Sequence, residues 1–226
     1  MASSSPCCGA IVDAVSRQLL LLDVDNTLYP PSSGVVDRVD ALINRYLVER
    51  VGVDPAEVDV IRRRLWSDYG TTLHGLMHGH GIDPEDYLGF VHAIELDDLL
   101  SRDDGLAAML RRIPLLKIAV TNGSAAHARG VLACLGVRDL FFRVYGLERL
   151  GFVPKPYVQA YQAVLADLHA LGRDCVLVED RAVNLRAARQ LGMRTVYVAD
   201  GGPPAADADA SIGSILELEA ALAELA

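Results

Sequence analysis

Asp23 and Asp25 stand two residues apart at the end of the apolar run QLLLLDV, residues 18–24. Two carboxylates placed in this way can share one reaction: one attacks phosphorus, while the other donates a proton to the leaving oxygen and later activates water. The segment DVDNTLYP, residues 23–30, also fits a plain turn in which Asp25 and Asn26 accept hydrogen bonds from turn amides. The pair alone therefore leaves both interpretations open.

A carboxylate that attacks a phosphate dianion needs positive charge nearby, because the two anions repel each other. Lys155 is the candidate, since it stands in the segment VPKPY, between two prolines and just before a predicted helix. The chain has one other lysine, Lys117, which begins a predicted strand and is expected at the surface. Lysine carries a compact charge that arginine does not replace, so we predict that Lys155 binds phosphate.

Polar residues also end two further predicted strands. Thr121 and Asn122, in the segment VTNG, would offer a hydroxyl and backbone amides to phosphate oxygens at the start of the next helix. Asp180 ends the segment CVLVED with Glu179 beside it, and Asn184 follows one helical turn later. Because Mg²⁺ prefers oxygen ligands, we predict that it binds at Asp180, a residue that could also cap the helix.

These residues need a fold that brings strand ends together, and the hydrophobic pattern predicts one. Short apolar runs predict strands, and helical patterns lie between them. The strands are expected at residues 18–24, 117–122, 142–146, 174–180 and 195–200, and the helices at residues 124–136, 156–172 and 181–192. The alternation predicts an α/β fold with a doubly wound, parallel, Rossmann-like sheet. Ligands bind beyond the carboxyl ends of such strands, where the candidate residues would meet.

Residues 32–102 interrupt the alternation, because their hydrophobic pattern is helical throughout. Segments 54–70 and 83–94 each open with Asp-Pro, which is typical of the start of a helix. We therefore predict an all-helical cap domain at residues 32–102, inserted into a catalytic core of residues 1–31 and 103–226.

Some side chains of this predicted cap are candidates for substrate contact. Tyr69 and His74 stand where a cap loop could close over the pocket and exclude water. Trp66 is expected to pack inside the cap, and the arginines at residues 62–64 to form a solvated helix face. Four cap histidines could alternatively form a zinc-binding module, although no nearby cysteine completes the ligand set. These are His74, His78, His80 and His92.

The ordered set DVDNT, TNG, KP and VEDRAVN resembles the motifs of the haloacid dehalogenase superfamily of phosphohydrolases, and it covers nearly the whole chain. The resemblance implies that Asp23 is the nucleophile and Asp25 the general acid and base. It also implies that Thr121 and Lys155 hold phosphate. The ligands that it implies for Mg²⁺ are Asp23, the backbone carbonyl of Asp25, and Asp180. It further implies that Glu179 and Asn184 orient these groups without binding the metal or phosphate directly.

The insertion after the first motif is similar to the C1 type of helical cap, and the segments DNTLYP, YGTTLHGL and FVH resemble the pyrimidine 5'-nucleotidase subgroup. This implies a magnesium-dependent phosphomonoester hydrolase with an aspartyl-phosphate intermediate, acting on a nucleoside 5'-monophosphate of the pyrimidine or XMP type. A sugar-phosphate or phosphoglycolate phosphatase and a β-phosphoglucomutase-like phosphotransferase are the alternatives. Asp25 disfavours a dehalogenase, which lacks the second aspartate, and the lysine-free cap disfavours a phosphonatase.

The composition limits the partners that we expect. The 226 residues carry a net charge of −9, which argues against binding to a nucleic acid backbone. No apolar stretch is long enough to cross a membrane, and the first ten residues lack the pattern of a secretory signal. The four cysteines show no paired spacing, as in a reduced intracellular protein. We therefore expect a cytoplasmic monomer or homodimer that acts on a small phosphorylated metabolite.

Overall fold

The computed structural model describes residues 18–225. The expectation about the first ten residues falls outside this range. Within it, a six-stranded parallel sheet has the strand order β3-β2-β1-β4-β5-β6. The strands are β1 (Leu19–Leu22), β2 (Leu116–Val120), β3 (Phe141–Tyr145), β4 (Cys175–Glu179), β5 (Arg194–Val198) and β6 (Ala210–Ile212). Strand β1 lies between β2 and β4 and is completely buried, as its uninterrupted leucines require.

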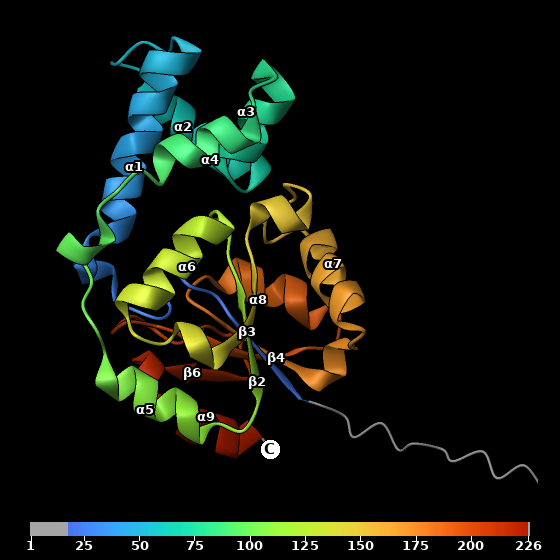
Figure 1. The fold of residues 1–226 in the computed structure, drawn as a ribbon. Helices are drawn as coiled ribbons and strands as arrows, with labels where there is room; N and C mark the ends of the chain where they lie inside the picture. The colour runs from blue at the N-terminus through green and yellow to red at the C-terminus, as the bar shows by residue number, and fades with distance from the viewer. Residues whose placement is uncertain (1–17, 226) are drawn as a thin grey trace, which may run out of the picture.

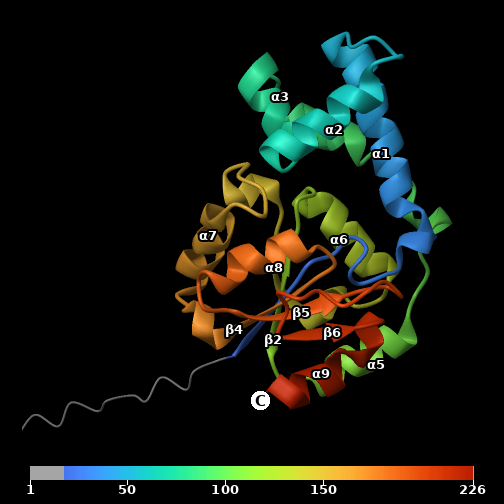
Figure 2. The same ribbon diagram turned by 180° about the vertical axis from the view of Figure 1, so that it is seen from behind.

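Helices cover both faces of this sheet (Figures 1 and 2). One face is covered by α5 (Asp104–Arg112), α6 (Ala125–Cys134) and α9 (Leu218–Leu225), which share a hydrophobic cluster with Leu20 and Leu22. The other face is covered by α7 (Val158–Leu168) and α8 (Ala182–Arg189), which pack with Leu19 and Leu21. Because alternate leucines of β1 face opposite sides, one strand contributes to both clusters. The predicted doubly wound α/β fold is confirmed.

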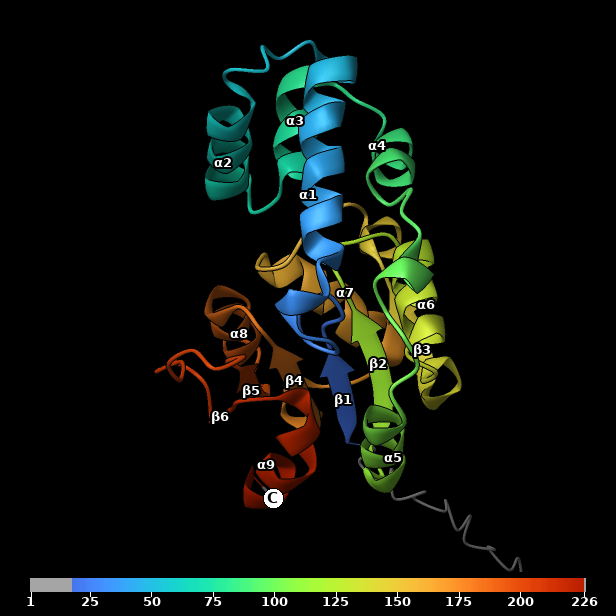
Figure 3. The same cartoon turned by 90° about the vertical axis from the view of Figure 1, so that its left-hand side faces the viewer.

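Four helices lie apart from the sheet, beyond the carboxyl ends of its strands (Figure 3). They are α1 (Val35–Tyr46), which continues as a π-helical turn (Leu47–Val51), α2 (Val58–Tyr69), α3 (Thr72–His80) and α4 (Pro84–Val91). We call α1–α4 the upper helices. They enclose a hydrophobic cluster, separate from those of the sheet, which includes Tyr46, Leu76 and Tyr87 and to which Leu147 of the core also belongs. Residues 32–102, all of them described, contain no strand, as the helical pattern predicted.

Local signals explain where the upper helices begin. The carboxylate of Asp83 accepts a hydrogen bond from the backbone N–H of Glu85 at 2.9 Å and caps α4. The other Asp-Pro segment, at residues 54–55, does not start a helix. Asp54 accepts a hydrogen bond from the N–H of Ala56 at 2.8 Å in a turn, and α2 begins four residues later than the sequence predicts. The hydroxyl of Thr71 caps α3 through the N–H of His74 at 3.1 Å.

The prediction that Lys117 lies at the surface is wrong. Its side chain is buried, and Nζ donates to the backbone carbonyls of Ile113 and Leu115. Helix α5 ends just before these residues, so the ammonium satisfies carbonyl groups near its carboxyl end. Burial accordingly lowers the pKa of Lys117. Among the described residues, no helix is long and apolar enough to span a bilayer.

Candidate active site

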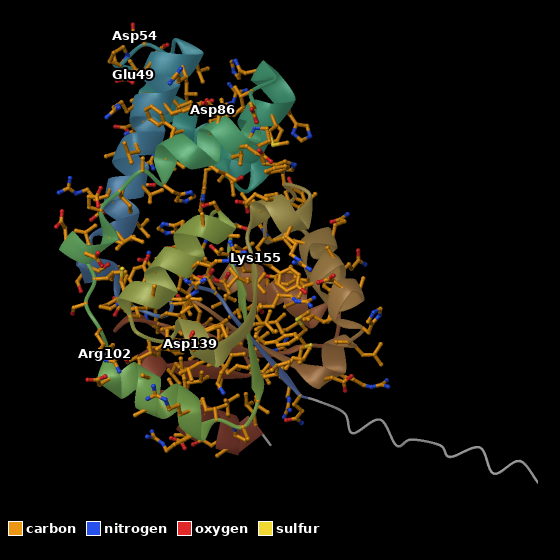
Figure 4. All side chains as sticks on the ribbon, in the orientation of Figure 1. Glu49, Asp54, Asp86, Arg102, Asp139 and Lys155 are labelled. Atoms are coloured by element: carbon orange, nitrogen blue, oxygen red, sulfur yellow. The ribbon has the colours of Figure 1, made fainter. Side chains whose placement is uncertain are left out.

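The candidate residues converge on one cavity of about 440 Å³ between the sheet and the upper helices. Asp23 follows β1, Thr121 follows β2, and Asp180 follows β4, and these three strands are neighbours in the sheet. Lys155 reaches the same point from the loop before α7, and Figure 4 shows it in the interior, below the upper helices. The side chains predicted from separate strand ends therefore line one site. They are Asp23, Asp25, Thr121, Asn122, Lys155, Glu179, Asp180 and Asn184.

Lys155 is the centre of this arrangement. Its side chain is 1% exposed, and Nζ lies 2.7 Å from Asp23 Oδ1 and 2.7 Å from Glu179 Oε1. The third donor of the ammonium reaches the backbone carbonyl of Val120 at 2.8 Å. Burial alone would lower the pKa of Lys155, but the two carboxylates outweigh it and raise the pKa above its ordinary value. The ammonium thus stays charged next to the predicted nucleophile.

Asp23 is held on both of its carboxylate oxygens. Oδ1 accepts from Lys155, and Oδ2 accepts from the hydroxyl of Thr27 at 2.9 Å. Its backbone N–H donates to Val178 of the neighbouring strand at 3.0 Å, so the residue is still fixed to the sheet. Burial raises the pKa of Asp23, and Lys155 acts against this rise. The carboxylate is oriented and poorly solvated, two properties that suit an attacking group.

Asp25 lies beside it with a different set of partners. Oδ1 accepts from the Tyr29 hydroxyl at 2.6 Å and from His127 Nε2 at 2.8 Å, whereas Oδ2 faces the Thr121 hydroxyl at 3.4 Å. Burial would raise the pKa of Asp25, but His127 and the hydrogen bond from Tyr29 outweigh it and lower the pKa to about 2. In this state Asp25 is a carboxylate and ready to act as a base. A phosphate dianion arriving beside it would raise its proton affinity.

His127 is a residue that the sequence analysis missed. It lies in the first turn of α6, where the Ser124 hydroxyl caps the helix by accepting from the His127 N–H at 3.1 Å. A helix that starts at the carboxyl end of a strand directs its first turn toward the site. The sequence did contain a signal for His127: it is a polar residue three positions after the TNGS turn, in the first turn of the predicted helix.

The segment that follows β4 supplies the acidic part of the site. Glu179 is fully buried: Oε1 accepts from Lys155 and from the Asn184 amide, and Oε2 accepts from Arg181 N–H at 2.9 Å. Oxygens of Asp23, Glu179 and Asp180 lie within 4.8 Å of one another. Burial, together with Asp23 and Glu179, raises the pKa of Asp180 to about 8. Three carboxylates thus face a single ammonium, an excess of negative charge that fits a divalent cation.

The phosphate-binding loop predicted after β2 is shaped by its own hydrogen bonds. Thr121 Oγ1 accepts from Gly123 N–H at 2.9 Å. The Asn122 side chain binds the backbone of Lys155 twice, since Nδ2 donates to its carbonyl at 2.9 Å and Oδ1 accepts from its N–H at 2.8 Å. Asn122 therefore fixes the loop that carries Lys155. The phosphate contacts of Thr121 and Asn122 stay predictions.

The upper helices close the cavity with residues that were expected elsewhere. Trp66 does not pack inside the upper helices: it is 49% exposed, lines the cavity, and lies under the guanidinium of Arg181 at 4.5 Å from the ring centroid. Arg62 and Arg63 also line the cavity and are not merely a solvated face. Arg62 is paired with Asp40 at 2.6 Å, which leaves Arg63 as the exposed cation of the two.

Tyr69 and His74 do not line the cavity. His74 Nδ1 lies 3.1 Å from the Tyr69 carbonyl, and its ring forms a T-shaped contact with that of Tyr157, with the ring centroids 5.1 Å apart. These two residues therefore join α2 and α3 to the loop of Lys155, and their substrate contact stays a prediction. His92, in contrast, lines the cavity. Among residues 18–225, the group with metal-ligand spacing is the acidic one, and it includes none of the four histidines of the zinc alternative.

A parallel α/β sheet with a charged site at the carboxyl ends of adjacent strands defines a class of α/β enzymes. The haloacid dehalogenase-like hydrolase family matches residues 18–192, and the chain belongs to this family. A phosphoglycolate phosphatase of Cupriavidus necator is 30% identical over 222 residues, 96% of this chain and 87% of that protein. Phosphate metabolism protein 8 of Saccharomyces cerevisiae is 24% identical over 79% of this chain, which spans 60% of that protein's length.

Solved structures share the fold. A HAD phosphatase from Thermococcus onnurineus has a TM-score of 0.62 at 18% identity, over 91% of this chain and 97% of that chain. A 2-haloacid dehalogenase from Pseudomonas syringae has a TM-score of 0.59 at 22% identity, over 92% of this chain and 99% of that chain. Phosphatases and dehalogenases thus share this architecture, and the residues of the site must distinguish between the two activities.

Proposed function

We propose that the protein is a magnesium-dependent phosphomonoester hydrolase in which Asp23 becomes phosphorylated. The observation that carries this proposal is the pairing of a buried carboxylate with a charged Lys155 at 2.7 Å, while a second carboxylate, Asp25, faces the same cavity. A carboxylate that attacks a phosphate dianion needs a cation such as Lys155 beside it, and an alkoxide leaving group needs a proton donor such as Asp25. A dehalogenase, which releases halide, has no use for Asp25.

Each residue has a defined task in the proposed reaction. Asp23 attacks phosphorus, and the ammonium of Lys155 offsets the charge that gathers on the phosphoryl oxygens. Asp25 gives a proton to the departing ester oxygen, and in the second step it takes one from the water that attacks the aspartyl-phosphate. Glu179 accepts a hydrogen bond from Lys155, and Asn184 in turn donates to Glu179 and holds it in place. The upper helices act as a C1-type cap, with the boundaries at residues 32 and 102, and exclude bulk water.

Asp23, the carbonyl of Asp25, and Asp180 would hold Mg²⁺, and the bound ion supplies positive charge to the phosphate oxygens. The fit rests on the cluster itself, because oxygens of Asp23, Glu179 and Asp180 converge within 4.8 Å. Glu179 is already occupied by three donors, so Asp23 and Asp180 have the freer oxygens.

A nucleoside 5'-monophosphate, of the pyrimidine or XMP type, is the proposed substrate, as in the pyrimidine 5'-nucleotidase subgroup. The cavity volume of about 440 Å³ suits a small ligand. We call the side of the cavity that the upper helices form its roof, and the side at the sheet edge its floor. The roof is largely apolar and could cover a flat base, with Trp66 at the rim as a stacking surface. The apolar lining residues from the upper helices are Val36, Val39, Ile43, Leu73, Leu88 and Val91, and Leu147 joins them from the segment after β3.

Phosphoglycolate is the second candidate, because the phosphatase of Cupriavidus necator named for it is 30% identical to this chain. Its carboxylate would need a cation inside the cavity, and Arg63 could provide it. A phosphotransferase of the β-phosphoglucomutase type would use the same two aspartates and would depend on a sugar bisphosphate for activation.

The test measures phosphate release from UMP, CMP, XMP, phosphoglycolate and sugar phosphates, each with Mg²⁺ and with a chelator. We expect activity that needs Mg²⁺ and favours the nucleotides. A clear preference for phosphoglycolate would select the second candidate, and activation by a sugar bisphosphate would select the phosphotransferase. Equal, feeble rates on every ester would refute the nucleotidase proposal. Mass spectrometry of acid-quenched protein should find the phosphoryl group on the peptide that contains Asp23.

A further inference from the structure

The two oxygens of Asp25 are held unequally. Oδ1 accepts two short hydrogen bonds, from Tyr29 Oη at 2.6 Å and from His127 Nε2 at 2.8 Å. Oδ2 has a single neighbour of this kind, the Thr121 hydroxyl at 3.4 Å, which is long for a bond between two oxygens. Oδ1 is therefore anchored, and Oδ2 remains available on the side of the predicted phosphate loop.

The imidazole of His127 has this carboxylate as its one hydrogen-bond partner among the described residues. The side chain is 1% exposed, and Nδ1 is buried without a partner. Since a carboxylate can only accept, Nε2 must carry the hydrogen that lies between the two groups. Both nitrogens of a buried imidazole normally have hydrogen-bond partners. The His127 ring has one partner, Asp25, and this points to a role in holding that carboxylate.

His92 fixes the plane of this ring. The imidazoles of His92 and His127 are stacked, with centroids 4.4 Å apart and planes 22° apart. His92 is itself oriented by its Nδ1, which lies 3.0 Å from the Leu88 carbonyl. A Cβ at Gly123 would lie 3.3 Å from His92 and 3.4 Å from His127, so glycine leaves just enough space for both rings beside the loop. His92 follows the last residue of α4, and the stack thus joins the upper helices to Asp25 through His127.

We propose that His127, stacked under His92 and aided by Tyr29, is a positioning residue that anchors Oδ1 of Asp25 and reserves Oδ2 for proton transfer. The inference rests on the proposed function. Arrival of the phosphate dianion raises the proton affinity of Asp25, and Oδ2 takes up a proton from water. In the first step the Asp23–phosphorus bond forms, the phosphorus–ester oxygen bond breaks, and this proton moves from Oδ2 to the ester oxygen. In the second step water attacks phosphorus, its proton moves to Oδ2, and the Asp23–phosphorus bond breaks.

This role predicts a dependence on the leaving group. A sugar alkoxide needs the proton of Asp25 in order to leave, whereas p-nitrophenolate leaves without it. A misplaced Asp25 should therefore slow phosphoryl transfer from UMP and spare transfer from p-nitrophenyl phosphate. The first step is isolated in single-turnover experiments with the protein in excess over ester, in the presence of Mg²⁺.

His127→Asn is the main variant, because its shorter amide cannot reach Oδ1. We expect transfer from UMP to slow by about 10-fold or more, and transfer from p-nitrophenyl phosphate to stay within about 2-fold. His127→Gln places an amide N–H near the position of Nε2 and should restore most of the rate with UMP. His92→Ala should show the same selectivity at a smaller size. The matched control is His80→Ala, an exposed histidine outside the cavity, which should change neither rate.

Equal slowing of both esters by His127→Asn would overturn the inference, because a merely structural histidine would not distinguish leaving groups. Failure of His127→Gln to restore transfer from UMP would overturn it as well. If His127→Asn does not fold, Tyr29→Phe removes the second donor to Oδ1 by deleting one oxygen, and it must show the same selectivity. If the unchanged protein transfers phosphate from neither ester, the proposed function fails, and the inference fails with it.

Discussion

The floor and the roof of the cavity are built in opposite ways. The floor, at the sheet edge, consists of buried charged groups whose donors and acceptors are nearly all used, as in the contacts of Lys155 with Asp23 and Glu179. The roof, from the upper helices, consists mainly of apolar side chains, together with the half-exposed ring of Trp66. Few hydrogen bonds fix the roof to the floor. The contacts between them include ring contacts such as Trp66 with Arg181, and the apolar contact of Leu147 with the upper helices.

This difference indicates a division of labour. A saturated polar network specifies one arrangement and tolerates little change. An apolar surface with aromatic contacts can be altered without leaving buried charges unpaired. Changes to the floor should therefore affect the chemical step and the stability of the protein, whereas changes to the roof should affect which ester binds.

The largest effect is expected at Asp23. Asp23→Asn keeps the size of the side chain and its hydrogen bond to Lys155, but it removes the attacking oxygen anion. Turnover of every ester should fall by about 10⁴-fold or more, because no other group can take over the attack. Steady-state assays, with circular dichroism to verify folding, measure this. Asp37→Asn, at an exposed aspartate of α1, is the control. Substantial magnesium-dependent activity in Asp23→Asn would exclude Asp23 as the nucleophile.

Substitution of Lys155 should lower both the unfolding free energy and the turnover, because the same ion pairs of the floor support both. Lys155→Met leaves Asp23 and Glu179 buried without their cation, which should cost about 3–5 kcal/mol of unfolding free energy and abolish measurable turnover. Adding Glu179→Gln removes one of the unpaired charges, so the double variant should regain part of the stability but none of the activity. Urea unfolding and steady-state assays measure both quantities. An unchanged unfolding free energy in Lys155→Met would contradict the reported ion-pair network.

The sequence predicted the floor better than the roof for a physical reason. Buried parallel strands are continuous apolar runs, so their ends, and with them Asp23, Thr121 and Asp180, could be found by inspection. The pattern could not reveal β6, which has three residues and follows a polar loop, or α3, which is rich in glycine and histidine. Both are stabilised by packing against other elements, α3 against α2 and α4, and β6 against β5 and α9, and not by their own periodicity.

Side-chain partners across the cavity were beyond prediction from a pattern. Trp66 was expected inside the upper helices because tryptophan is apolar, but Arg181, more than 100 residues later, covers its ring at the surface. His127 and His92 pair in the same way, across 35 positions. Lys117 was expected to be solvated, and the loop between α5 and β2 supplies its acceptors. Each of these errors concerns a polar or aromatic side chain whose partner lies outside its own helix or strand.

The proposed metal site should make the stability of the floor depend on pH. In the metal-free protein the pKa of Asp180 is raised to about 8, so folding favours its protonated form. The resulting stabilisation is complete below the ordinary carboxyl pKa and is lost as the pH rises through about 8. Mg²⁺ needs the ionised form, so the gain in stability from Mg²⁺ over a chelator should be larger near pH 8.5 than near pH 6. Urea unfolding under the four conditions measures it.

Asp180→Asn should reduce this difference between the two pH values, because the variant has no proton to lose at this position. Asp23, whose pKa burial raises to about 7, accounts for the part that remains. Asp200→Asn, at an exposed aspartate, should keep the full difference. A gain from Mg²⁺ that is the same at both pH values in the unchanged protein would argue against Asp180 as a ligand.

The smallest effect is expected in the roof, at Trp66. Trp66→Ala deletes a ring that lines the cavity and stacks with Arg181. If this ring contacts the base of a nucleotide, the KM for UMP should rise by about 5- to 10-fold with kcat nearly unchanged, and the KM for ribose 5-phosphate should stay the same. Val60→Ala, at an exposed residue of the same helix outside the cavity, should change neither value. An equal loss of kcat on both esters would show that Trp66 helps the roof to close over any substrate. The proposal that the roof sets specificity while the floor performs the chemistry would then be wrong for Trp66.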